Sequence, residues 1–396
     1  MTKRRDRGDG GIDERGENSW RLRYRVKSKR ITQTFHGSLS DARKELRRLL
    51  KSGDDGTHVA PDKITLGQRI DQWIAAGAPG RRQKRVGRRT LQRYAELLRC
   101  HVVPALGTRP LQQLQPAEID ALYRRLDGKI APRTAHHIHV VLGACLSASV
   151  RTGQLAANPL DRAERVPSPG EGTHGIALDQ EQLEVLLAGF RGSVLFPIVA
   201  VAAFTGARRS EILALRWSDL DSKAKTLHIE RAVDHVRGQA LALKAPKTAR
   251  GARTITIDDS LLGLLAAERE KHLRLAAGVP DGMVVDLSLV RLPDDALMFP
   301  SPPGPGEDFS FTKLRNPDNF TKEFVRRARK LGFASLRLHD LRGTHETLLL
   351  DAGVPVHVVA ARCGHDPAVL LRSYAKRTRK AAAAAIAVLS RGVLSK

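Results

Sequence analysis

The sequence predicts a mainly α-helical protein with small β elements, divided into three segments. Near the N-terminus, apolar and polar residues alternate in two short runs. The middle of the chain carries apolar residues at helical spacing, and the last segment mixes helical stretches with two further alternating runs. At 396 residues the chain is long enough for two or three domains, each with its own core. The fold class predicted is therefore mainly α, with an α+β module first, a helical domain second and a mixed domain last.

The first segment, residues 1–58, reads as the small α+β module. Residues 20–26 and 29–35 alternate cationic or polar residues with apolar ones, as neighbouring strands do. Ser40 and Asp41 are expected to cap a helix over residues 42–50.

Three arginines share one face of the first predicted strand, opposite its apolar face: Arg21, Arg23 and Arg25. A cationic sheet face suits contact with a phosphate backbone, and a solvated sheet face is the alternative. A Gly-Asp-Asp-Gly run at residues 53–56 indicates a linker after the module.

The second segment, residues 62–168, is expected to be entirely helical. The predicted helices cover residues 66–74, 90–100, 116–123 and 134–150. Between the first two lies a dense cationic run: Arg81, Arg82, Lys84, Arg85, Arg88 and Arg89. That density favours phosphate binding over a merely solvated surface. Three histidines at 136, 137 and 139 are interpreted as packing or solvated side chains rather than a metal site, and Pro and Gly residues at 167–172 indicate a domain boundary.

The third segment, residues 174–396, is mainly helical, with short alternating runs at 226–230 and 253–257. Four separated pieces of this segment carry groups suited to chemistry on a phosphate. The first piece is Thr-Gly-Ala-Arg208-Arg-Ser-Glu211, whose spacing lets Glu211 hold the Arg208 guanidinium. The second is Pro-Lys247-Thr, interpreted as the turn of a β-hairpin, with Lys244 close enough to leave the choice of lysine open.

The third piece is His339-Asp-Leu-Arg342, where the spacing puts both side chains on one helical face. The fourth is Gly-His365, followed nine residues later by Tyr374. Each piece alone is weak evidence for a site. Their occurrence together in one domain is strong evidence.

These four pieces resemble, in order and context, the catalytic motifs of the tyrosine recombinases, the family of phage integrases and bacterial Xer-type recombinases. The resemblance covers residues 174–380 at the level of motifs. It implies a catalytic domain of the tyrosine recombinase type at 174–396, a helical core-binding (SAM-like) domain at 62–168 and an arm-type DNA-binding module at 1–58. The departures, Cys363 before Gly-His and Gly343 after Arg342, remove no catalytic group.

The resemblance also implies the role of each residue. Tyr374 is the expected nucleophile, which attacks a DNA phosphodiester and becomes a 3′-phosphotyrosine. Arg208 and Arg342 are expected to stabilise the transition state, with Glu211 in support. Lys247 is the expected general acid, His339 assists proton transfer, and His365 donates a hydrogen bond to the phosphate.

Composition and spacing exclude several other classes of protein. The three cysteines, Cys100, Cys145 and Cys363, lie far apart and support neither a disulfide framework nor a zinc site. No ATP or other cofactor is expected, because covalent catalysis conserves the phosphodiester energy. No metal is implied either, because two arginines take the place that metal ions hold in many nucleases. The sequence shows no signal peptide and no apolar stretch long enough to span a membrane. We therefore expect a cytoplasmic protein of a bacterial host, associated with the nucleoid.

The net charge of +25, from 67 Lys and Arg against 42 Asp and Glu, points to a polyanionic partner. The resemblance implies that this partner is double-stranded DNA at attachment sites, bound by a homotetramer on two synapsed duplexes. Integration of a phage or mobile element is the expected function, and whether the same protein also excises it is left open. The attachment sequences, the host, and the need for an accessory DNA-bending or directionality factor are left open.

Within the same chemistry, a Xer-type recombinase is the nearest alternative, and the segment at residues 1–60 favours an integrase. A type IB topoisomerase fits less well, because it acts alone on non-specific duplex. A repressor that had lost catalysis would lack at least one catalytic residue, and none is missing.

Overall fold

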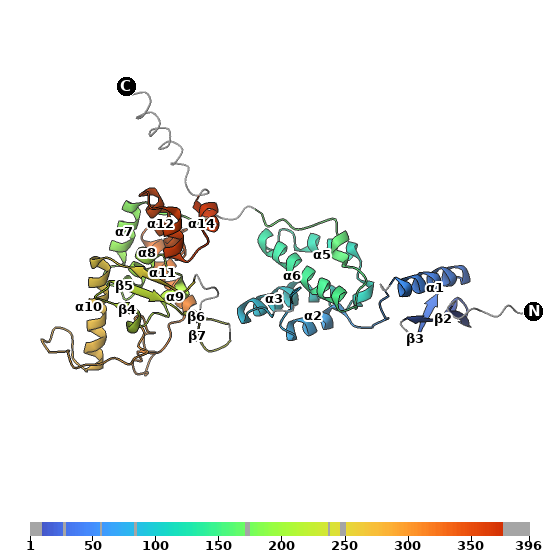
Figure 1. The fold of residues 1–396 in the computed structure, drawn as a ribbon, viewed down its shortest axis with the longest axis horizontal. Helices are drawn as coiled ribbons and strands as arrows, with labels where there is room; N and C mark the ends of the chain where they lie inside the picture. Colours follow the sequence, from blue (N-terminus) through green and yellow to red (C-terminus); the bar gives the residue numbers. More distant parts are fainter. Residues whose placement is uncertain are drawn as a thin grey trace, which may run out of the picture. The chain divides into compact units, whose positions relative to one another are not determined.

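The computed structural model describes residues 10–26, 29–55, 58–82, 85–170, 175–236, 238–245 and 251–374, with side chains up to Leu371. The chain forms two compact units, Met1–Gly172 and Thr173–Lys396. Helices dominate both units, and each sheet is small and antiparallel (Figure 1). The predicted fold class is confirmed. Within the described residues, no helix is both long and apolar enough to cross a membrane.

The first unit opens with a three-stranded sheet in the order β1 (Gly11–Gly16), β2 (Ser19–Val26), β3 (Lys29–His36), followed by helix α1 (Leu39–Asp54). Leu22 and Tyr24 of β2 pack against Leu46 and Leu49 of α1. The sheet has one strand more than the sequence predicted.

The start of α1 differs from the prediction. Ser38 is the N-cap, because its hydroxyl oxygen accepts a hydrogen bond from the backbone N–H of Asp41 at 3.1 Å. The predicted cap at Ser40 and Asp41 is therefore wrong, and the helix begins at Leu39. On the face of β2 opposite Leu22 and Tyr24, Arg23 forms an ion pair with Asp13 at 2.7 Å, which leaves Arg21 and Arg25 beside it.

The rest of this unit is helical: α2 (Leu66–Ala75), α3 (Arg88–His101), α4 (Val103–Leu106), α5 (Pro116–Leu126) and α6 (Pro132–Arg151), with 3₁₀ turns η1 (Leu111–Gln113) and η2 (Pro159–Arg162). Its core includes Trp73, Leu98 and Leu142. Five of the predicted DNA-contacting cations are exposed: Arg81, Arg82, Arg85, Arg88 and Arg89. Lys84 lies outside the described residues.

The histidines of α6 lie among aromatic rings and backbone groups. Tyr123 Oη contacts His139 Nδ1 at 2.9 Å, and His137 packs edge-on against Tyr94. His136 Nδ1 donates to the carbonyl of Pro167 at 2.8 Å. These contacts agree with a packing role.

The second unit contains the helices α7 (Gln180–Phe190), α8 (Phe196–Thr205), α9 (Arg209–Ile212), α10 (Asp259–Ala276), α11 (Pro317–Lys330), α12 (Asp340–Asp351), α13 (Val356–Cys363) and α14 (Pro367–Tyr374), with a 3₁₀ turn η3 (Trp217–Asp219). Its strands are β4 (Leu220–Asp221), β5 (Thr226–Ile229), β6 (Ala232–Asp234), β7 (Ala242–Lys244) and β8 (Arg253–Thr256). Helix α8 is apolar on every side and mostly buried, so it runs through the core of the unit.

The predicted hairpin around Lys247 is not formed by the strands on either side of it. Strand β7 pairs with β6, whereas β8 pairs with β5 in a separate sheet of order β4-β5-β8. The segment after β7 therefore connects two sheets. Lys247 itself lies outside the described residues.

Candidate active site

A tight turn after α8 places Arg208. Gly206 ends the helix in the left-handed conformation, with φ of 62°. A Cβ atom at this position would lie 2.7 Å from His345 Cδ2 and 3.0 Å from Cys363 Sγ, so both the backbone angle and the space require glycine. The chain then turns so that Arg208 sits at the start of the short helix α9.

Glu211 binds two arginines that are distant from each other in the sequence, Arg208 and Arg253. Its Oε1 accepts from Arg208 Nη1 at 2.8 Å, and its Oε2 accepts from the Arg208 backbone N–H and from Arg253 Nη2, both at 2.9 Å. Burial opposes ionisation of this carboxyl group, but the two guanidinium groups outweigh burial and hold the pKa of Glu211 below its ordinary value. The predicted pairing of Arg208 with Glu211 is therefore present, with a further partner on β8.

Arg342 lies in the first turn of α12 and is 2% exposed. Its Nη1 donates to the carbonyl of Gly206 at 2.6 Å and its Nη2 donates to the carbonyl of Cys363. Burial, chiefly, lowers the pKa of this guanidinium below its ordinary value, which still leaves it charged at neutral pH. Helix α12 is thus tied to the turn after α8 and to the end of α13.

The turn after α13 brings His365 to the same place. Gly364 ends α13 with φ of 65°, and its carbonyl accepts from Arg208 Nη2 at 3.3 Å. His365 Nε2 lies 3.1 Å from Arg342 Nε. Three of the four predicted pieces of the site therefore converge through Arg208, Arg342 and His365.

His339 is the N-cap residue of α12 and keeps access to solvent. Loss of hydration among its neighbours and the positive charge of Arg342 lower the pKa of its imidazole. The ring is therefore neutral at pH 7, as a group that accepts a proton must be.

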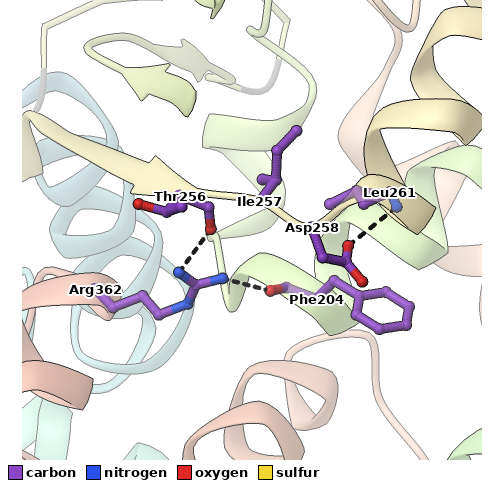
Figure 2. Close-up of a pocket in the computed structure, with 6 residues that line it drawn as sticks. All are labelled: Phe204, Thr256, Ile257, Asp258, Leu261 and Arg362. Atoms are coloured by element: carbon purple, nitrogen blue, oxygen red, sulfur yellow. Dashed lines mark hydrogen bonds between the residues drawn. The ribbon is translucent and has the colours of Figure 1, made fainter. Parts of the chain in front are cut away.

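A second layer of side chains fixes these elements together. His345 Nδ1 donates to the carbonyl of Ala203 at 2.9 Å, and its Nε2 accepts from Arg362 Nε at 3.2 Å. Both contacts require a neutral ring, and burial and Arg362 lower the pKa of His345 to about 4. Arg362 also donates to the carbonyls of Thr256 and Phe204, which join α13 to β8 and α8 (Figure 2).

Arg362 lines one side of a pocket of about 350 Å³, with Phe204, Ile257 and Leu261 among its other walls (Figure 2). The Asp258 carboxylate at its edge caps α10 by accepting from the backbone N–H of Leu261 at 3.0 Å. The Arg362 guanidinium and the Asp258 carboxylate of this pocket are therefore both hydrogen-bonded to the protein backbone.

Tyr374 is the last residue of α14, and its side chain lies outside the described residues, as does Lys247. Helix α14 packs through Leu370 against Val359 and Ala360 of α13. The alternative lysine, Lys244, is described: it ends β7 and forms an ion pair with Asp234.

The sequence did not identify Arg253, His345 or Glu346 as parts of this arrangement. Glu346 is 3% exposed and its Oε1 lies 2.8 Å from His365 Nε2 and 3.2 Å from Arg342 Nε. A signal was available, since Glu346 lies four residues after Arg342 and therefore on the same helical face. Within the described residues, no group of three or more His, Cys, Asp or Glu side chains could hold a metal ion.

Comparison with known sequences gives two family matches. A model described as the phage integrase central domain matches residues 67–165, and one described as the phage integrase family matches residues 178–380. Among curated relatives, an integrase of Streptomyces ambofaciens is 26% identical over 391 residues, which cover 96% of this chain and 95% of the relative.

Comparison with solved structures gives the same fold. The integrase of transposon Tn1549 (residues 82–397, R225K) in complex with a circular intermediate DNA has a TM-score of 0.64 and 18% identity, over 82% of this chain and 99% of that one. A lambda integrase tetramer bound to a Holliday junction has a TM-score of 0.53 and 15% identity, over 92% of this chain and 94% of that one.

Proposed function

Because the chain belongs to the phage integrase family and is a tyrosine-type site-specific recombinase, we propose that it cleaves and rejoins DNA through a 3′-phosphotyrosine at Tyr374. The observation that supports this most directly is the convergence of Arg208, Arg342 and His365 through the turns at Gly206 and Gly364. Integration of a phage or mobile element is the proposed biological role, and excision is its reversal.

The proposed reaction begins when the phenol oxygen of Tyr374 attacks the scissile phosphorus. The bond to the 5′ oxygen breaks, which leaves a 3′-phosphotyrosine and a free 5′-hydroxyl. A 5′-hydroxyl from the partner duplex then attacks the phosphotyrosine and releases the phenol. The phosphodiester energy is conserved, so no ATP is consumed.

Each polar group has a proposed task in these steps. Arg208 and Arg342 donate N–H groups to the non-bridging oxygens as negative charge accumulates in the transition state. His339, neutral at pH 7, takes the proton from Tyr374, a weak nucleophile while it stays a phenol. Lys247 returns a proton to the leaving 5′ oxygen, and Glu211 keeps Arg208 in place.

Double-stranded DNA is the proposed partner. The residues proposed to contact it are Arg21, Arg23 and Arg25 in the arm-type module at 1–58, and Arg81, Arg82, Lys84, Arg85, Arg88 and Arg89 in the core-binding domain at 62–168. The exposure of Arg81, Arg82, Arg85, Arg88 and Arg89 supports this assignment. Since recombination exchanges two strands from each of two duplexes, the proposed assembly on DNA is a homotetramer.

The experiment uses a nicked suicide substrate that traps the covalent intermediate. The wild-type protein is expected to form a protein–DNA adduct, and Tyr374→Phe is expected to form none while it binds the same site with similar affinity. The phenol hydroxyl contributes little to an interface dominated by phosphate contacts. Adduct formation by Tyr374→Phe would contradict the assignment, and loss of most of the affinity would place Tyr374 in DNA binding instead.

A further inference from the structure

Arg253 brings a second, buried guanidinium group to the carboxylate that binds Arg208. It is the first residue of β8, and its side chain is 6% exposed, against 37% for that of Arg208. Arg253 Nη2 donates to Glu211 Oε2 at 2.9 Å, while Arg208 Nη1 donates to Glu211 Oε1 at 2.8 Å. One buried carboxylate is therefore shared by a buried arginine and a partly exposed one.

The backbone around Arg253 fixes its position. Its Nε donates to the carbonyl of Arg362 at 2.8 Å, and its Nη1 donates to the carbonyl of Gly251 at 3.1 Å. Arg362 Nη1 in turn donates to the carbonyl of Thr256 at 2.9 Å, so β8 and α13 are joined in both directions. All three nitrogens of the Arg253 guanidinium group donate to acceptors within the protein, which makes Arg253 an internal group.

The charges of the three side chains do not cancel, because Glu211 carries one negative charge and the two arginines carry two positive ones. Burial raises the pKa of Glu211, and among the groups that lower it the hydrogen bond and the charge of Arg253 come before the hydrogen bonds of Arg208. Arg253 is therefore the principal counter-ion of the buried carboxylate. Without it, Glu211 and Arg208 would form a neutral pair, which attracts a phosphate less than a cation does.

We propose that Arg253 is a positioning residue that neutralises Glu211, so that Arg208 meets the scissile phosphate with its full positive charge. This inference rests on the proposed function of Arg208. Arg253 does not touch the DNA; it acts through Glu211 and Arg208. A carboxylate that orients an arginine also cancels its charge, and a second arginine on the same carboxylate restores that charge for the transition state.

The test compares two nicked suicide substrates that differ in charge at the scissile position. One carries the normal phosphodiester, and the other carries a methylphosphonate, in which a methyl group replaces one non-bridging oxygen and removes one negative charge. Release of the strand with the free 5′-hydroxyl is measured in single turnover. Arg253→Gln is expected to lose roughly 10- to 100-fold on the phosphodiester and only about 2- to 5-fold on the methylphosphonate. Arg253→Lys keeps the charge and is expected to lose less than about 5-fold on the phosphodiester.

Two further variants serve as controls. Arg208→Ala removes the phosphate-binding charge itself, so its loss is expected to shrink on the methylphosphonate as well. Arg231→Gln breaks another ion pair of this unit, with Asp219 at 2.7 Å, in which the aspartate side chain is 5% exposed. Its loss is expected to be equal on both substrates, because Arg231 pairs with Asp219 and not with Glu211. A smaller folded fraction lowers both rates of one protein sample by the same factor and cancels in their ratio.

A Glu211→Gln background shows whether Arg253 acts through Glu211. The carboxylate charge is then absent, so the substrate-dependent part of the Arg253→Gln loss is expected to vanish. A loss that is equal on the two substrates, or one that persists unchanged in the Glu211→Gln background, overturns the inference while leaving the proposed function intact. Absence of any strand cleavage by the wild type would contradict the proposed function instead.

Discussion

At the scale of single residues, Glu211 and Glu346 organise the cations of the site. Glu211 binds Arg208 and Arg253, and Glu346 contacts Arg342 and His365. Buried charges of this kind are costly unless paired, and breaking one pair leaves the partner uncompensated. The arginines are therefore held in fixed positions by the protein itself, as their proposed role in stabilising a transition state requires.

The general acid can be identified with a modified substrate. Lys247→Ala is expected to slow cleavage of normal DNA by roughly 10²- to 10⁴-fold, because the 5′ oxygen leaves poorly without a proton. A sulfur atom at the 5′ bridging position leaves without one, so it is expected to restore most of that rate. Arg208→Ala, which removes stabilisation of non-bridging oxygens, is expected to gain nothing from sulfur.

Lys244→Ala is the matched control for Lys247. Lys244 is held by Asp234 at the end of β7, and the variant is expected to cleave normal DNA nearly as wild type does. If sulfur rescues Lys244→Ala and leaves Lys247→Ala slow, the two assignments must be exchanged. Rescue of neither variant would place the acid elsewhere.

His345 makes stability depend on pH. Its pKa is about 4 in the folded protein, against about 6.5 for an unperturbed histidine. Since the folded pKa is depressed, its contribution is fully present above about pH 6.5 and is lost as pH falls towards 4. The shift corresponds to about 3 kcal/mol. Between pH 6.5 and pH 4, the free energy of unfolding of the wild type, measured by chemical denaturation, is expected to fall by about 3 kcal/mol more than that of His345→Gln. An equal fall in the two proteins would contradict this.

At the scale of elements, two glycine turns bring the site together. Gly206 and Gly364 both adopt left-handed angles, and the carbonyls of both accept hydrogen bonds from site arginines. The turns at these two helix ends therefore position the proposed catalytic residues Arg208, Arg342 and His365. Turns of this kind can be predicted from the sequence, because each is marked by a glycine at the end of a helix: Gly206 in Thr-Gly-x-Arg and Gly364 in Gly-His.

Gly206→Ala tests the first turn. A left-handed alanine costs about 1 kcal/mol, and the overlap with His345 and Cys363 is expected to raise the total loss of unfolding free energy to about 3 kcal/mol. Gly192→Ala is the control, because Gly192 has φ of 73° but no atom within 4 Å of the added Cβ. It is expected to lose about 1 kcal/mol. The free energy of unfolding is measured by thermal unfolding. Similar losses in both variants would show that the overlap of the added Cβ with His345 on α12 and Cys363 on α13 has no effect on stability.

The long-range features of the site could not be predicted from the sequence. Arg253 reaches Glu211 across 42 residues, and no local periodicity encodes that contact. The pairing of β8 with β5 rather than β7 is of the same kind, because alternation identifies a strand but not its partner. Most predicted helices agree closely with the structure. The error at the start of α1 arose from two competing serine caps, Ser38 and Ser40, and the predicted linker at 53–56 is wrong at its start, because α1 continues to Asp54.

At the scale of the whole molecule, the proposal divides DNA binding between modules. Deleting residues 1–60 is expected to leave cleavage of a core-site suicide substrate intact and to abolish integration and binding to separate arm sites. Changing Arg21 and Arg25 to Ala, which spares Arg23 and its ion pair with Asp13, is expected to lower the salt dependence of arm binding by a slope of about 2. If the truncated protein folds but cannot cleave core-site DNA, residues 1–60 belong to the part of the protein that binds the core site.

The central claim is that Tyr374 is the nucleophile. The chain has four tyrosines. Burial raises the pKa of Tyr24 and Tyr123, which makes both phenols poor nucleophiles, and Tyr94 stacks on Trp73 in the helical core. The direct measurement is mass spectrometry of peptides from the trapped adduct. We expect a nucleotide attached through its 3′-phosphate to the peptide that contains Tyr374. A nucleotide on any other residue, or attached through a 5′-phosphate, would contradict the account.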